Sequence, residues 1–132
     1  MEKFPFKCPA GVPKEVRKQF NYFEKLLAPR GNWTEGDIDG IMALCESKVA
    51  VAKLRKEVDE EGRTYWATTG QGNRVMKTNP ACALLDKEIR RFDNYLYEYG
   101  LTPLGRIKLG ISPDGGGPLD EIEDKDDAAK YF

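Results

Sequence analysis

The clearest pattern in the chain is an amphipathic repeat between residues 14 and 28. Val16, Phe20, Phe23 and Leu27 recur at spacings of three and four residues, which is typical of one face of an α-helix. Pro29 is placed to end that helix. The positions between the apolar residues carry four basic side chains, Lys14, Arg17, Lys18 and Lys25. The pattern predicts a short helix with a buried aromatic face and basic side chains left on the remaining surface.

A second, longer helix is predicted from Thr34 to about Asp59. Thr34 and Asp37 have the spacing of a capping box, and Gly62 is placed to end the helix. Its apolar residues occupy two faces: Ile38, Ile41, Leu44, Cys45, Val49, Val51, Ala52, Leu54 and Val58. A helix that is apolar on two faces usually contacts more than one neighbour.

Residues 63–78 change in character. Thr64, Tyr65 and Trp66 favour strands, and the segment 70–73 has the composition of a turn. We expect a β-hairpin or an irregular arm here.

A third helix is predicted from Asn79-Pro80, which is an N-cap followed by the favoured first helical residue, to Tyr99. Its apolar residues alternate at spacings of four and three, as in a coiled-coil seam: Leu85, Ile89, Phe92, Leu96 and Tyr99. Gly100 is expected to end this helix. Thr102 and Pro103 are expected to begin a short fourth helix that reaches about Leu109.

These elements predict a mainly α fold. It is a long antiparallel helical hairpin with a shorter N-terminal helix, a short C-terminal helix and a small β-hairpin or irregular arm. One hairpin cannot cover all of the predicted apolar surface, so we expect copies of the chain to associate into a homo-oligomeric ring. The seam of the third helix is the predicted oligomerisation surface.

Composition supports one folded domain with a tail. Of 132 residues, 40% are hydrophobic and 33% are charged, and we expect residues 1–110 to form one helical domain and residues 111–132 an acidic, Gly-rich tail. The net charge of −1 hides blocks of opposite sign. Residues 1–30 hold seven basic and three acidic side chains, whereas 31–61 hold four and eight. Such blocks suit self-association together with contact to nucleic acid, although solvated helix faces are an equally good interpretation.

The chemistry-bearing residues argue against an enzyme. The chain has no histidine, and its three cysteines are far apart in sequence, which favours reduced thiols over a metal site or a disulfide. No cofactor or metal is predicted. The first residues, MEKFPFKCPAG, lack the apolar stretch of a signal peptide, and no apolar run is long enough for a membrane span, so we expect a cytoplasmic protein with no membrane partner.

One constellation resembles a known family. The segment 79–110 opens with Asn-Pro-Ala, and its long helix is followed by Gly-Leu-Thr-Pro with Arg106 three positions on. This arrangement resembles one branch of the phage terminase small subunits. The resemblance implies a non-enzymatic protein that forms a ring and binds double-stranded viral DNA in the host cytoplasm. It also implies delivery of the DNA to a terminase large subunit that carries the ATPase and nuclease, which the small subunit regulates.

Two groups of basic residues are the candidates for DNA contact. The first is Arg90, Arg91, Arg106 and Lys108, and the second is Lys14, Arg17 and Lys18. Arginine suits phosphate because its planar fork donates two parallel hydrogen bonds. Alternatively, Arg90 and Arg91 pair with Asp86, Glu88 or a neighbouring chain. Because the second helix begins with acidic residues, we expect contact with the DNA backbone rather than base reading.

The last residues carry a further prediction. Leu119, Ile122, Tyr131 and Phe132 flank an acidic run and are candidate anchors for docking on the large subunit, the alternative being a solubilising tail. The rival function is a dimeric DNA-binding regulator unrelated to packaging, and a non-DNA adaptor is a third class. Solution mass separates a ring from a dimer.

Overall fold

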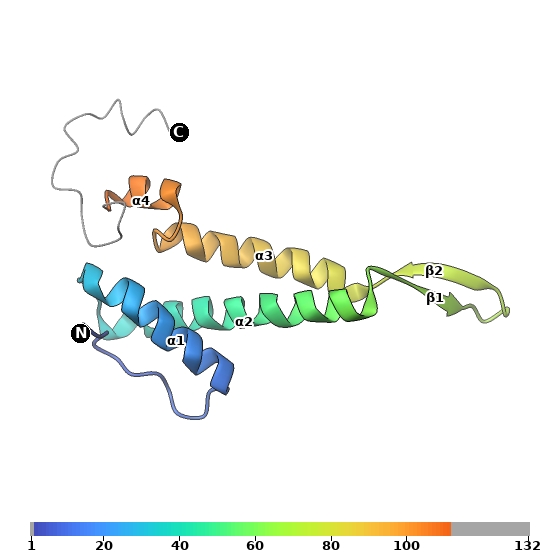
Figure 1. Cartoon of the computed structure of the whole chain (residues 1–132), viewed down its shortest axis with the longest axis horizontal. Helices are drawn as coiled ribbons and strands as arrows, with labels where there is room; N and C mark the ends of the chain where they lie inside the picture. Colours follow the sequence, from blue (N-terminus) through green and yellow to red (C-terminus); the bar gives the residue numbers. More distant parts are fainter. Residues whose placement is uncertain (1, 112–132) are drawn as a thin grey trace.

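The computed structural model describes residues 2–111, and Figure 1 shows their arrangement. Two long helices, α2 (Ile38–Glu61) and α3 (Pro80–Glu98), lie antiparallel and are connected by a two-stranded arm. Helix α1 (Lys14–Leu27) packs against the first half of α2, and α4 (Pro103–Leu109) follows the end of α3. The mainly helical class and the antiparallel hairpin are therefore confirmed for the single chain. The predicted tail, with Leu119, Ile122, Tyr131 and Phe132, lies outside the described residues.

The larger core lies between α1 and the first half of α2. The four apolar residues predicted for α1 are all buried, together with Ile41, Leu44 and Cys45 of α2. The N-terminal segment closes this core, because Phe4 and Phe6 are buried and stack with ring centroids 4.8 Å apart. The sequence pattern gave no element for this segment, whose two phenylalanines nevertheless complete the aromatic face of α1.

A smaller core joins α2 to α3. It contains Val51, Val58, Ala81, Cys82 and Leu85, all buried. Phe92 of α3 packs against both cores, so the two form a continuous apolar layer along the hairpin. The broad apolar surface predicted for α2 is explained by this arrangement: its first half packs on α1 and the end of α3, and its second half packs on the start of α3, whereas Ala52 is exposed.

The start of α2 differs in detail from the prediction. The capping box is present, with the Thr34 backbone N–H donating to Asp37 Oδ2 at 2.9 Å. The first turn, Glu35–Asp37, is a 3₁₀-helix labelled η2, and the α-helix proper begins at Ile38 and runs to Glu61. Gly62 ends it with φ of 82°, a conformation that favours glycine. A second 3₁₀ turn, η1 (Ala28–Arg30), follows α1.

The arm is a β-hairpin, as one of the two sequence alternatives predicted. Strand β1 (Thr64–Thr68) pairs antiparallel with β2 (Arg74–Thr78), and Trp66 lies opposite Met76. No residue from 63 to 78 is buried. The arm thus extends beyond the packed part of the hairpin, as Figure 1 shows.

The ends of α3 are fixed by the residues that the sequence singled out. Asn79 Oδ1 accepts the Ala81 N–H at 3.0 Å, so the predicted N-cap is confirmed. After α3, Gly100 has φ of 63°, and Thr102 Oγ1 accepts the Gly105 N–H at 2.9 Å to begin α4. These residues turn the chain back at the end of α3 (Figure 1).

Candidate nucleic-acid interface

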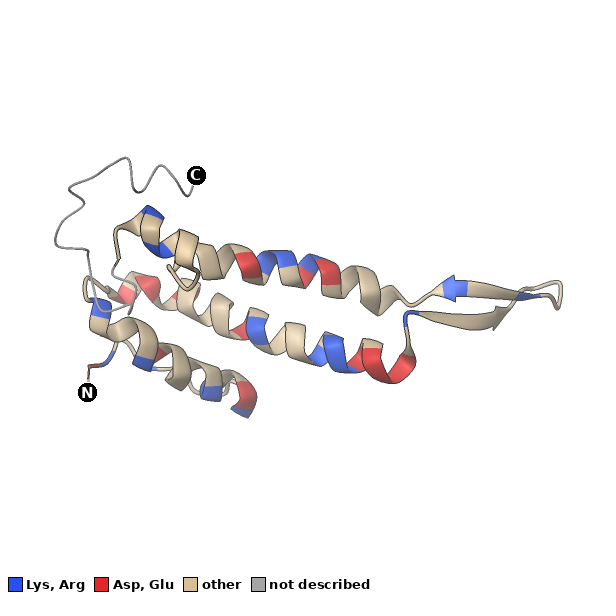
Figure 2. Cartoon of the chain, turned by 45° about the horizontal axis from the view of Figure 1, so that its top comes forward, with Lys and Arg blue, Asp and Glu red and all other residues tan. Residues whose placement is uncertain are grey.

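Helix α1 carries several basic side chains on the surface opposite its buried apolar face. Because its apolar face is buried, the side chains on the opposite side are exposed: Lys14, Arg17, Lys18 and Lys25. Figure 2 shows basic residues distributed along this helix. Of its two acidic residues, Glu24 is turned inward, where it accepts the Phe4 N–H at 3.2 Å and lies 4.0 Å from Lys3, whereas Glu15 is exposed in the first turn. The exposed side of α1 is therefore a predominantly basic stripe, which we call the α1 face.

The basic side chains of the α1 face make few interactions within the described chain. Arg17 donates to the Pro9 carbonyl at 2.9 Å, which ties it to the N-terminal segment. Within residues 2–111, no ion pair involves Lys14 or Lys18. Charges of this kind are available to a polyanion without first breaking an internal pair.

A further cation, on α2, adjoins α1. Lys48 Nζ lies 4.2 Å from the ring centroid of Tyr22, an exposed aromatic residue of α1. Partial burial lowers the pKa of Lys48. Sequence reasoning missed this residue, because its approach to Tyr22 depends on how α1 crosses α2.

The arginines of α3 differ from each other. Arg91 lies 3.7 Å from Glu88, and its guanidinium stands over the Tyr95 ring at 5.7 Å. A side-chain hydrogen bond with Tyr95 is the main cause that raises the pKa of Arg91. Glu88 also accepts the hydroxyl of buried Ser47 at 2.9 Å, which links α2 to α3. Arg91 thus makes the internal pairing with Glu88 that was the alternative to DNA contact. Arg90 and Arg91 are both exposed, and Arg90 forms no ion pair among residues 2–111.

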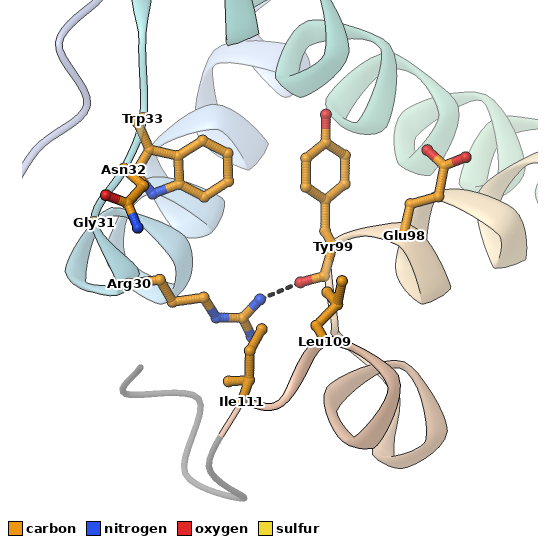
Figure 3. A pocket seen from close by; sticks show the side chains of 8 residues that line it. All are labelled: Arg30, Gly31, Asn32, Trp33, Glu98, Tyr99, Leu109 and Ile111. Carbon is orange, nitrogen blue, oxygen red and sulfur yellow. Dashed lines mark hydrogen bonds between the residues drawn. The ribbon is translucent and has the colours of Figure 1, made fainter. Parts of the chain in front are cut away.

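Arg106, the third arginine of the first group, lies at the end of α3. It donates to the Gly100 carbonyl at 3.5 Å, and Arg30 donates to the same carbonyl at 3.0 Å and to that of Tyr99. Figure 3 shows Arg30 reaching this turn at the edge of a pocket of about 250 Å³ that Trp33 also lines. Burial, followed by the charge of Arg106, lowers the pKa of Arg30.

The two guanidiniums bind the carbonyls of Tyr99 and Gly100, directly after the last residue of α3, where the helix dipole favours positive charge. Arg106 thus makes a contact within the chain, whereas Lys108, the other basic residue of α4, is exposed. The candidate residues do not converge on one site. Lys14, Arg17 and Lys18 lie together on α1, whereas the other group is divided between the middle of α3 and α4 (Figure 1).

Comparison with known proteins decides the family. No curated protein and no solved structure matches the chain. A family model described as "Phage terminase, small subunit" matches residues 17–115, which is most of the sequence and includes nearly all of α1. The chain belongs to the phage terminase small subunits. It therefore has a role in phage DNA packaging, and members of this family are generally non-catalytic subunits.

The predicted oligomerisation seam of this small subunit faces largely inward. Leu85 is buried, and the other four members, Ile89, Phe92, Leu96 and Tyr99, are half-buried. They pack on the two cores of the same chain, because the antiparallel partner of α3 is α2. The large apolar side chains that remain exposed lie elsewhere: Tyr22, Leu26, Tyr65, Trp66, Met76, Leu84, Leu104 and Leu109.

The small subunit shows no cluster with the chemistry of a metal site in its described part. Among residues 2–111, no three His, Cys, Asp or Glu side chains are grouped so that they could hold an ion. Its cysteines are free thiols, and burial raises the pKa of Cys45 to about 12. None of the helices between residues 2 and 111 is long and apolar enough to cross a membrane.

Proposed function

We propose that this small subunit binds double-stranded viral DNA through the α1 face, assembles into a homo-oligomeric ring and delivers the DNA to the terminase large subunit. The observation that carries the proposal is the α1 face itself, a basic stripe on a protein of a DNA-packaging family. Phosphate groups are spaced regularly along DNA, and a row of lysines and arginines on one helix matches them without reading bases.

The α1 face is the stronger of the two candidate groups. Lys14 and Lys18 have no internal ion pair within the described chain, whereas Arg91 pairs with Glu88 and Arg106 contacts the Gly100 carbonyl. Arg90 and Lys108 are exposed and supply secondary contacts in this proposal. The acidic start of α2, with Glu35, Asp37 and Asp39, opposes insertion of that helix into a groove.

Ring assembly supports the DNA role by repetition. Each subunit offers only a few phosphate contacts, and a ring multiplies them at a high effective concentration. The exposed apolar side chains Tyr22, Leu26, Leu84, Leu104 and Leu109 provide surface for contacts between copies, beside the half-buried seam. Native mass spectrometry separates this proposal from the rival regulator, since a ring gives a high subunit number and the regulator gives a dimer.

The α1 face is tested by charge reversal. Lys14→Glu with Lys18→Glu should weaken binding of a fluorescent DNA duplex by roughly tenfold or more, because two phosphate contacts become repulsive. The matched control is Lys53→Glu with Arg55→Glu, which makes the same change of charge at exposed positions of α2. Equal loss in both variants would show a general charge effect, and no loss in the α1 variant would move the site to Arg90, Arg106 and Lys108.

Docking on the large subunit is proposed for the tail. Leu119, Ile122, Tyr131 and Phe132 would anchor it while the acidic run meets a basic groove. Removal of residues 115–132 should leave DNA binding intact and abolish stimulation of the large subunit's ATPase. Full stimulation by the shortened protein would return the tail to a solubilising role. The proposed setting is the host cytoplasm.

A further inference from the structure

The β-hairpin arm packs on neither of the two cores of the described chain. None of residues 63–78 is buried, and β1 and β2 pair with each other beyond the end of the helical hairpin. A two-stranded ribbon on its own is marginally stable in water. Neither DNA contact by α1 nor packing within the described chain accounts for the exposed surface of the arm.

One face of the arm is apolar and aromatic. The register places Trp66 directly opposite Met76, and their side chains are 57% and 51% exposed. The Arg74 guanidinium lies 4.9 Å from the centroid of the Trp66 ring, which keeps an extended aromatic and cationic surface in place. Trp, Met and Arg are the residue types that are enriched where two proteins meet.

The arm and its base carry opposite charges. Residues 62–85 contain three basic side chains, Arg63, Arg74 and Lys77, and no acidic one. The last turns of α2, directly before the arm, carry four exposed acidic side chains: Glu57, Asp59, Glu60 and Glu61. Glu60 lies 4.0 Å from Lys56, one of two exposed basic residues that directly precede this turn. Figure 2 shows the red last turn of α2 at the base of the arm, with blue positions before it and along the arm.

An exposed apolar residue lies at the same end of the hairpin. Leu84, near the start of α3, is 56% exposed, although its neighbour Leu85 is buried against α2. This end of the molecule therefore carries two complementary surfaces. One is the basic and aromatic arm. The other, which we call the acidic end, comprises the acidic last turns of α2 and Leu84 near the start of α3.

We propose that the arm docks on the acidic end of a second copy of this chain. Arg74, which lies on the same face of the ribbon as Trp66 and Met76, would then meet the partner's acidic turn, while Trp66 and Met76 would cover its exposed leucine. Lys77 pairs with Tyr65 on the other face of the ribbon and would add to the positive charge of the arm. Each strand has five residues and spans about 17 Å, which exceeds the 8–10 Å between packed helices, so the arm is long enough to cross a neighbour. This inference rests on the proposed self-assembly and names an interface within it.

DNA is a less suitable occupant of the arm. The acidic turn at the base would repel phosphates close to Arg63 and Lys77. The apolar pair Trp66 and Met76 also requires a partner that excludes water, which an acidic protein surface with a leucine provides better than a phosphate backbone does. A second copy of the chain would match both the charge pattern of the arm and its exposed apolar area.

A charge-swap cycle on the full chain tests the proposal without DNA. Arg74→Glu with Lys77→Glu should raise the concentration needed for half-assembly by roughly tenfold or more, and Glu57→Lys with Glu61→Lys should do the same. The four changes together restore the attraction with reversed sign, so assembly should return to near the wild-type concentration. All four positions are exposed, so the fold is expected to tolerate the changes. Lys14→Glu with Lys18→Glu is the matched control and should assemble like the wild type.

Acrylamide quenching of Trp66 gives a second measurement. The Trp66 signal is the difference between the wild type and Trp66→Phe, and its quenching should fall as the protein assembles in the absence of DNA. The inference is overturned if the arm variant assembles like the wild type and Trp66 stays accessible to acrylamide in the oligomer. That result would leave the proposed self-assembly intact and exclude only the arm as its interface. Shielding of Trp66 only after DNA is added would make the arm a nucleic-acid contact and overturn it too. A wild-type chain that never assembles would overturn the oligomer itself, and this inference with it.

Discussion

A few polar side chains hold the helices of this small subunit in place. Asn79 caps α3 through its Oδ1, and its Nδ2 donates to the Gly62 carbonyl at 2.8 Å, so one side chain joins the end of α2 to the start of α3. Arg30 does the same at the other end of the hairpin, where it binds the carbonyls of Tyr99 and Gly100. Both residues connect segments that the arm keeps far apart in sequence.

The local sequence predicted the N-cap role of Asn79, but not its contact with Gly62 or the role of Arg30. An Asn before a Pro and a helical pattern indicates an N-cap, and Asn79 is one. The bond to Gly62 and the role of Arg30 depend on partners 17 and about 70 residues away, so no local pattern could reveal them. The contact of Arg106 with the Gly100 carbonyl joins residues only six apart, but it depends on how the turn after α3 places α4, so the sequence showed Arg106 only as a DNA candidate.

Cys45 gives a prediction at this scale. Its thiol is fully buried, and its pKa is raised to about 12, whereas the ordinary value is 9.0. Between these values the unfolded chain loses the proton and the folded chain keeps it, so stability is present below pH 9 and falls as pH rises above it. The loss approaches about 1.4 kcal/mol per pH unit.

Urea unfolding between pH 8 and pH 10.5 measures this loss. Cys45→Ala should lower the free energy of unfolding at every pH. It should also remove the part of the decline with rising pH that the Cys45 thiol causes. An identical decline in the wild type and in Cys45→Ala would show that Cys45 does not cause it.

At the scale of elements, periodicity predicted the helices and the arm, and tertiary contacts decided what each one buries. The spacing in α1 correctly predicted the burial of Phe20 and Phe23. The seam of α3 was also correctly recognised as apolar, but periodicity cannot say whether the surface that covers it belongs to the same chain. In this structure that surface is α2, so Phe92 packs on the two cores of its own chain.

The packing of α4 depends on one glycine. A Cβ placed on Gly105 would lie 2.6 Å from the Tyr97 carbonyl oxygen, which is backbone and cannot move aside easily. Gly105→Ala should therefore displace α4 from α3 and weaken the contact of Arg106 with the Gly100 carbonyl. Hydrogen–deuterium exchange across residues 103–109 should become faster.

The matched control for this substitution is Gly70→Ala in the arm. A Cβ at Gly70 would meet nothing within 4 Å, so this variant should leave exchange in α4 unchanged. Unaltered exchange in Gly105→Ala would mean that α4 is not held by the close approach at Gly105.

At the scale of the whole molecule, the functional surfaces are separated along the hairpin. The α1 face lies beside the first half of α2, and the arm projects from the opposite end (Figures 1 and 2). In the proposed function, this separation would let one copy hold DNA and contact its neighbour at the same time. The sequence predicted both DNA contact and self-association, but the places where charge and exposed apolar area coincide emerge only after folding.

The salt dependence of DNA affinity tests the central claim most directly. Each phosphate neutralised by a basic side chain contributes about −0.9 to the slope of log affinity against log salt. If several subunits each present the α1 face, the wild-type slope should be steeper than about −3, and Lys14→Glu with Lys18→Glu should flatten it. A wild-type affinity that does not change with salt would contradict the account, because no phosphate contact could then carry the binding.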